Sequence, residues 1–142
     1  IIDSKLSLNE QYLLLRDMPS NFTSLVNPML DSKGGLFKDG EVSGGSIGIS
    51  FARLWKGEVG GIILRPTADM PWDYTPVLGI TEKLGFVSFE IRDDEKMVIP
   101  GPLTIYNGKT IYHKADRLFI HQSRAGEFIE WLRNCRRIVF NF

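Results

Sequence analysis

The sequence lacks several features that would assign it at once to a large class of proteins. It has one cysteine, Cys135, in 142 residues, which excludes an internal disulfide and any metal site built from several cysteines. It has no excess charge, with 17 Lys and Arg against 17 Asp and Glu, so tight nonspecific binding to duplex DNA is not expected. No apolar run approaches the roughly 20 residues of a membrane-spanning helix, and we expect no membrane association.

Histidine is also scarce, with only His113 and His121 in the chain. Neutral imidazole serves as a general base or a metal ligand, and Asp116 lies between the two histidines in the sequence. No third metal ligand is evident, and no motif is strong enough to indicate a catalytic site. We therefore expect no metal, no cofactor and a protein that is not an enzyme, with a hydrolase that uses one histidine and Asp116 as a minor alternative.

What remains is the composition of a folded domain, with 43% hydrophobic residues and a length within the usual range of about 100–150 residues. We predict a single domain over 1–142, with a helical arm and glycine-rich loop at 1–45, an antiparallel sheet at 46–122 and a C-terminal helix at 123–142. The lone cysteine suits a reducing compartment, so we expect an intracellular protein of the cytoplasm or an organelle matrix. The chain begins at Ile1, which indicates a removed leader or an excerpt of a longer protein.

A helix is predicted near the N-terminus. Ser7 and Glu10 have the spacing of a capping box, in which two side chains satisfy the first free amides of a helix. Leucines follow at helical spacing, and Pro19 ends the run because it disfavours a helical conformation in the preceding residue. The stretch 31–45 holds five glycines and predicts a mobile loop.

The next segment predicts a β-hairpin. From Ile47 to about Leu54 apolar residues alternate with small or polar ones, which is typical of a strand with one buried face. Residues 55–58 form a predicted turn, and residues 59–65 return as a second strand.

Further strands are predicted downstream. A proline-rich loop at 66–76 precedes predicted strands at 77–81 and 86–92. Asn107-Gly108 supplies the positive φ angles of a tight turn, which predicts a hairpin over 103–112.

The C-terminal part predicts a strand followed by a helix. Residues 117–121 form the strand, and Ser123 can cap a helix whose apolar residues fall on one side. The elements together predict an α+β fold: a mainly antiparallel β-sheet of about six to eight strands, with an N-terminal helix and a C-terminal helix packed on it.

Two glycine-containing stretches resemble phosphate-binding loops. Residues 44–48 resemble half of a dinucleotide-binding fingerprint, but a strand is predicted after them, so their amides would not converge at a helix N-terminus. A flexible entry to the sheet is the interpretation we prefer. Gly108-Lys109-Thr110 falls in a predicted hairpin, where a phosphate-binding loop needs a strand followed by a helix.

Aromatic and basic residues are interleaved along the predicted sheet. Single-stranded nucleic acid is bound by this combination, because flat rings stack on bases and cations follow the phosphates. The alternative is that the rings form the core and the cations face solvent. The candidate nucleic-acid-binding residues are Arg53, Trp55, Lys56, Arg65, Trp72, Tyr106 and Lys109.

Residues 49–59, with Lys56-Gly57 at their centre, resemble the strand, Lys-Gly turn and strand of the Whirly and transcriptional-coactivator class of single-strand-binding proteins. The passage from 118–120 into the C-terminal helix is similar to the end of that fold. The resemblance implies a curved antiparallel sheet followed by a helix, and it carries over only Lys56 and Gly57 as site positions.

These observations predict a non-enzymatic binding domain for single-stranded nucleic acid, with Trp55, Trp72 and Tyr106 stacking on bases. Arg53, Lys56 and Lys109 would contact phosphates. The alternative is a protein-interaction, assembly or regulatory domain that binds a protein partner through a helix or a sheet edge. A homo-oligomer is also left open.

Overall fold

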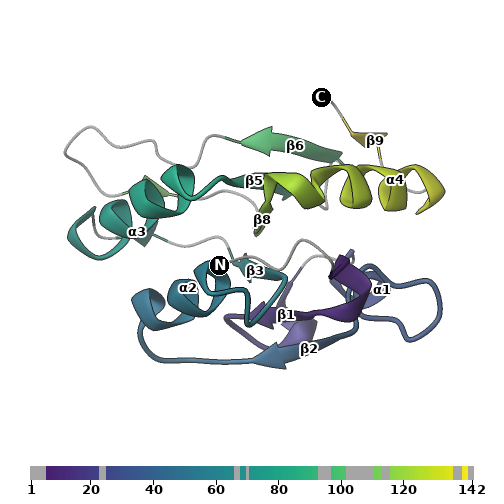
Figure 1. The fold of residues 1–142 in the computed structure, drawn as a ribbon, viewed down its shortest axis with the longest axis horizontal. Coiled ribbons are helices and arrows are strands. Elements are labelled where there is room, and N and C mark those ends of the chain that lie inside the picture. The colour runs from purple at the N-terminus through teal and green to yellow at the C-terminus, as the bar shows by residue number, and fades with distance from the viewer. Residues whose placement is uncertain are drawn as a thin grey trace.

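A computed structural model describes residues 6–22, 25–65, 68–69, 71–92, 97–101, 111–112, 116–135 and 139–140 (Figure 1). The helices are α1 (Val26–Met29), α2 (Ile47–Trp55), α3 (Pro71–Lys83) and α4 (Ala125–Cys135), with 3-10 turns at Leu8–Glu10, Pro19–Asn21 and Gln122–Arg124. The strands of the main sheet are β1 (Tyr12–Leu15), β2 (Asp39–Val42), β3 (Gly61–Leu64), β5 (Phe86–Arg92), β6 (Met97–Gly101), β8 (Asp116–His121) and β9 (Val139–Phe140). A separate antiparallel pair joins β4 (Ala68–Asp69) to β7 (Ile111–Tyr112).

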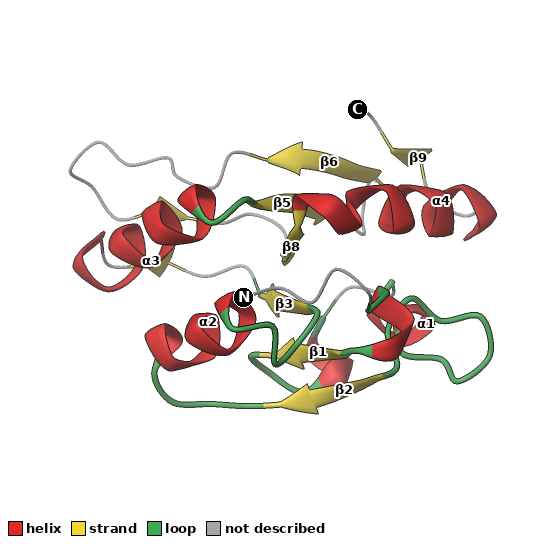
Figure 2. Ribbon diagram, viewed as in Figure 1, coloured by secondary structure: helices red, strands yellow, loops and turns green. Residues whose placement is uncertain are grey.

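The main sheet has the strand order β2-β1-β3-β8-β5-β6-β9. Its first strands are parallel, because β1 pairs in parallel with both β2 and β3. β8 is antiparallel to β3 and β5, and β5 is antiparallel to β6. The α+β class is confirmed, but the sheet is mixed, and the prediction of a mainly antiparallel sheet is wrong. Parallel neighbours need a crossover. α1 lies in the connection from β1 to β2, and α2 lies in the connection from β2 to β3, which pairs with the other side of β1 (Figure 2).

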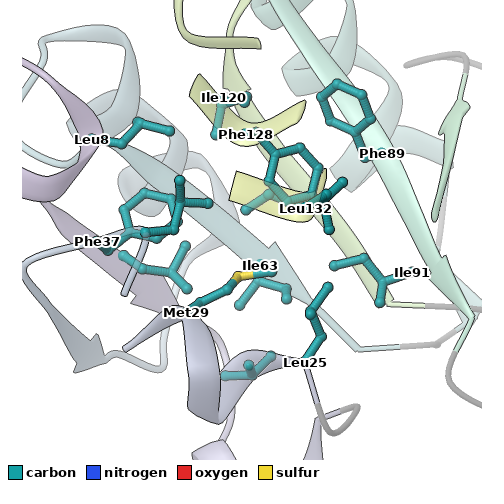
Figure 3. Packing of buried hydrophobic residues seen from close by; sticks show 14 of the residues in the cluster. Leu8, Leu25, Met29, Phe37, Ile63, Phe89, Ile91, Ile120, Phe128 and Leu132 are labelled. Carbon is teal, nitrogen blue, oxygen red and sulfur yellow. The ribbon is translucent and has the colours of Figure 1, made fainter. Parts of the chain in front are cut away.

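Both faces of the sheet are covered by helices. Leu13 and Leu15 of β1 face an apolar layer that holds α1 and α4 (Figure 3), whereas Leu14 faces a second layer that holds α2 and α3. Buried side chains of β3, β5 and β8 are likewise divided between the two layers, as Ile62 and Ile63 of β3 show. This arrangement explains the continuous apolar runs of β1, β3 and β8, since a strand covered on both faces needs no polar side.

The predicted N-terminal helix is a single 3-10 turn followed by β1. The capping-box spacing is real, since the Ser7 amide donates to Glu10 Oε1 at 3.5 Å. The leucines that follow belong to a strand, and all three of Leu13, Leu14 and Leu15 are fully buried. Pairing with strands on both sides satisfies their backbone groups, and this tertiary pairing outweighs the local helical signal.

The predicted hairpin at 47–65 is a helix, a turn and a strand. The Ser46 side chain caps α2 by accepting from the Ile49 amide at 3.5 Å. Phe51 and Leu54 are fully buried, whereas Ile49 is 68% exposed, so the apolar face follows helical spacing and not alternation. Gly57 turns the chain with a φ of 80°, so the turn is confirmed, and the strand predicted at 59–65 is confirmed as β3. Only the first strand of the predicted hairpin is wrong, because its residues form α2.

Other predictions had mixed outcomes. The predicted strand at 77–81 lies inside α3, whose Leu78 and Thr81 side chains are buried. The strand at 86–92 is confirmed as β5, and the C-terminal strand and helix are confirmed as β8 and α4, with Phe128 and Leu132 buried. The turn of the hairpin predicted at 103–112 lies outside the described residues.

The second apolar layer predicts a large loss of stability for Phe119→Ala. The Phe119 ring is fully buried and meets Phe51 edge to face, with ring centroids 5.1 Å apart. Removing a buried phenylalanine ring should lower the free energy of unfolding by about 3–5 kcal/mol, measured by urea unfolding. Ile49→Ala, on the exposed side of α2, should change it by less than about 0.5 kcal/mol. Similar losses in the two variants would contradict the orientation of α2.

Candidate functional site

The carboxyl ends of the parallel strands β1, β2 and β3 define one edge of the sheet. Open sheets bind ligands at this edge, where loops leave the strands. Arg16 follows β1 and Arg65 follows β3, while β2 leads through residues 43–46 into α2. In Figure 1 the arrowhead of β2 points to the left of the view, where this connection turns into α2. We call residues 43–46 the glycine loop.

The glycine loop presents backbone to open space. A Cβ placed on Gly44 or Gly45 would meet nothing within 4 Å, and Gly45 has a φ of 83° that favours glycine. The loop ends at Ser46, the cap of α2. The first amides of a helix have no partners within the helix, and the helix dipole makes this end attractive to anions.

This loop is the stretch that the sequence analysis set aside. The reason was that a strand was expected after it, which would direct its amides away from one another. The structure places a strand before it and α2 after it, so the reason was wrong. Ser46 is the sequence signal that could have predicted a helix at this point, because serine is a common first capping residue of helices.

Arg16 joins the glycine loop to the sheet. Its Nη2 donates to the Gly45 carbonyl at 2.7 Å, and its Nη1 donates to Ser50 Oγ at 2.8 Å. Neither acceptor carries a charge, and partial burial lowers the pKa of Arg16. The site therefore holds a guanidinium whose charge these two contacts do not neutralise.

Arg65 lies in a different electrostatic setting. Its Nη1 contacts Asp17 Oδ2 at 2.8 Å, and Asp17 also accepts from the Asn21 side chain and the Met18 amide at 2.8 and 2.7 Å. These donors, Arg65 foremost, lower the pKa of Asp17 to about 2. A stably ionised carboxylate thus balances the positive charge of Arg65.

Arg53 and Trp55, two further candidate residues from the sequence, contact partners other than Arg65. The Arg53 side chain forms ion pairs with Glu41 and Glu58, so it is held by carboxylates. Trp55 Nε1 donates to Thr81 Oγ1 at 2.9 Å and ties α2 to α3.

Lys56 is exposed in the turn after α2. Trp72 lies in the first turn of α3, but its side chain is not described. Tyr106 and Lys109 lie outside the described residues.

The histidine-based hydrolase alternative is not assembled in the described part of the chain. Asp116 begins β8 and His121 ends it, which separates them by roughly 16 Å at the rise of a strand. His121 Nδ1 instead lies 2.8 Å from Ser123 Oγ, and its ring packs edge-on against Phe86. His113 lies outside the described residues. Within the described ranges, no three His, Cys, Asp or Glu side chains are grouped so that they could hold a metal ion.

The fold is similar to that of inositol monophosphatases. Staphylococcal inositol monophosphatase II bound to inositol monophosphate is 13% identical, with a TM-score of 0.57 over 92% of this chain and 45% of that one. The Thermotoga maritima enzyme is 13% identical, with a TM-score of 0.55 over 94% and 44%. The staphylococcal enzyme bound to 2′-AMP is 12% identical, with a TM-score of 0.54 over 95% and 50%. The chain thus spans about half the length of each of these proteins.

No family model and no curated protein sequence matches the chain. The similarity at this level of identity establishes the fold and corrects the predicted resemblance to Whirly-like proteins, because residues 49–59 are the end of α2 and the turn after it rather than a hairpin. The prediction of a nucleic-acid-binding domain, which depended on that hairpin, is wrong. In the described parts of the chain, the helices are too short or too polar to cross a bilayer.

The pair formed by Asp17 and Arg65 predicts a pH-dependent contribution to stability. The pKa of Asp17 falls from 3.8 to about 2 on folding, so the pair stabilises the protein fully above about pH 4 and the effect is lost as the pH falls through about 2. Asp17→Asn should therefore lower the urea midpoint at pH 7, and its difference from the original chain should shrink between pH 4 and pH 2.

The control is Glu82→Gln, an equal change of charge at an exposed position of α3. It should leave the pH profile of the urea midpoint close to that of the original chain. A deficit in Asp17→Asn that stays constant down to pH 2 would show that the carboxylate does not act through its ionisation.

Proposed function

We propose that the chain binds a phosphate monoester at the glycine loop and takes part in its hydrolysis to an alcohol and inorganic phosphate. The observation that carries the proposal is the glycine loop at the N-terminus of α2 with Arg16 beside it. A phosphate group needs several N–H donors and positive charge, and this edge of the sheet offers both. Two of the similar structures were solved with phosphate monoesters, inositol monophosphate and 2′-AMP.

The electrostatics favour a terminal phosphate over a neutral ligand. The N-terminus of α2 contributes a partial positive charge, and Arg16 adds a full charge that its contacts to Gly45 and Ser50 leave uncompensated. Arg65 is already paired with Asp17 and adds less. An anion bound over the loop would neutralise the positive charge of Arg16, which its contacts to a carbonyl and a hydroxyl do not.

The hydrolytic step forms a bond between phosphorus and a water oxygen, breaks the ester bond and delivers a proton to the leaving alcohol. Many phosphatases use metal ions held by carboxylates for this step. The described residues do not fit such a group, because they contain no cluster of suitable ligands, and Asp17 is engaged by Arg65. We therefore assign to the described residues the binding and orientation of the phosphate.

Binding of inorganic phosphate to the chain tests the loop directly. The amide signals of Ser46 and Ile47 should shift on titration with phosphate in NMR spectra, because these groups face the proposed anion. Gly45→Ala should weaken binding by roughly fivefold, since strain of about 1 kcal/mol at a left-handed φ displaces the loop. Gly34→Ala is the matched control, because Gly34 has a φ of 78° and equally open surroundings.

The two glycine variants separate the site from general strain. Both should lose similar stability, and only Gly45→Ala should lose phosphate affinity. Equal phosphate affinity in the two variants would remove the glycine loop from the site.

Release of inorganic phosphate tests the reaction. The chain should release phosphate from inositol monophosphate or 2′-AMP, measured with and without added Mg²⁺, and should not hydrolyse a dinucleotide diester, whose phosphate lacks the third terminal oxygen. Phosphate binding without turnover would limit this chain to the binding part of the proposal. The absence of both phosphate binding and turnover would overturn the proposed function.

A further inference from the structure

We propose that Arg16 is a positioning residue that fixes the conformation of the glycine loop for anion binding. The proposal rests on the function proposed above and extends it to a residue that faces the loop from the sheet. Arg16 contacts the loop through the Gly45 carbonyl and the helix that follows it through Ser50, in the first turns of α2.

The backbone of Arg16 is itself well anchored. Its amide donates to the Ile63 carbonyl at 3.3 Å, so the residue continues the pairing between β1 and β3. The three preceding leucines are fully buried. Arg16 therefore directly follows a buried strand that is paired on both sides. A hydrogen bond from its guanidinium restricts the movement of the loop residue that accepts it.

The glycine loop needs such a contact. Two adjacent glycines have more backbone freedom than any other pair of residues, and no neighbouring atom lies within 4 Å of where a Cβ would stand on either of them. The loop backbone is bonded to the sheet at one end, where the Ser43 amide donates to the Leu15 carbonyl at 2.9 Å. The contact from Arg16 to Gly45 supplies a second fixed point between Ser43 and the helix.

Ser50 completes the arrangement. Its side chain is buried, accepts from Arg16 and donates to the Ser46 carbonyl at 3.3 Å. A hydroxyl has one proton to donate and lone pairs to accept, so both roles are filled at once. Arg16, Ser50 and Ser46 thus form a chain of hydrogen bonds from β1 to the cap of α2.

The geometry requires arginine rather than a positive charge alone. The two Nη atoms reach two separate acceptors at 2.7 and 2.8 Å, which a planar guanidinium achieves with one rotamer. A lysine ammonium is a single point of charge on a flexible stem and cannot hold the same two acceptors in a fixed relation. Arg16→Lys therefore keeps the charge and removes the fixed spacing.

The test compares Arg16→Lys and Ser50→Ala with Arg53→Lys. Arg53 is the control because it lies on the same helix as Ser50 but pairs with Glu41 and Glu58, away from the loop contacts. Amide hydrogen exchange is measured without phosphate at Ser43 and Ser50, whose amides are hydrogen-bonded on the two sides of the loop glycines, and phosphate affinity is measured by NMR titration. Urea unfolding confirms that each variant is folded.

We expect Arg16→Lys to speed exchange of the Ser43 and Ser50 amides and weaken phosphate binding, each by roughly tenfold. Ser50→Ala should shift both measurements in the same direction by less, and the double variant should lose less than the sum of the two single changes because the residues act together. Arg53→Lys should leave both measurements unchanged. If turnover is observed, Arg16→Lys should raise KM more than it lowers kcat.

The outcomes separate this inference from the proposed function. If the original chain binds phosphate and Arg16→Lys has the original exchange rates and affinity, the positioning role is overturned and the function stands. If the original chain binds no phosphate, the proposed function fails, and so does the role of Arg16 in anion binding. If Arg16→Lys speeds exchange without changing affinity, Arg16 stabilises the loop but does not position it for an anion, which also overturns the proposal.

Discussion

The packing of α2 against the sheet is the constraint on which the rest of the structure depends. Phe51 and Leu54 are fully buried against strands on one face, and Phe51 meets Phe119 of β8 edge to face. Because α2 lies on that face, the chain returns to the sheet in the direction of β2, and β3 becomes parallel to β1. The same crossover places the glycine loop at the carboxyl edge of the sheet, where the helix N-terminus and Arg16 meet. A hairpin in this position would have produced neither the parallel strands nor the site.

The sequence could predict the second half of the sheet better than the first. β5, β8 and α4 have clear signals, since Phe128 and Leu132 lie at helical spacing and the strands are short apolar runs. Residues 47–54 satisfy two patterns at once, because Ile47 and Phe51 fit both a period of about two and a period of about 3.6 residues. Only the burial of Leu54 and the exposure of Ile49 decide between them, and burial depends on contacts with strands distant in the sequence. The local alternation of apolar residues therefore could not decide whether this segment is a helix or a strand.

The same ambiguity explains what could be predicted of the site. Arg65 was among the candidate nucleic-acid-binding residues, and it does lie at the site edge, but its partner Asp17 follows a different strand. Arg16 carried no motif, because its role comes from a loop 29 residues further along the chain. The glycines at 44 and 45 were noticed and then dismissed on the expectation of a strand. Helical spacing of the apolar residues in the nine residues that follow, which form α2, would have placed the two glycines before a helix instead of a strand.

The balanced composition conceals an uneven distribution of charge at this edge of the sheet. Arg53 and Arg65 both contact carboxylates, so their charges are largely cancelled within a few ångströms. Arg16 contacts a carbonyl and a hydroxyl, and its partial burial lowers its pKa. A guanidinium stays protonated despite such a shift because its ordinary pKa lies far above neutral pH, so its charge remains available to an anion. A net charge of zero is thus compatible with a local preference for phosphate, since binding responds to the charges within about 10 Å rather than to their sum over the chain.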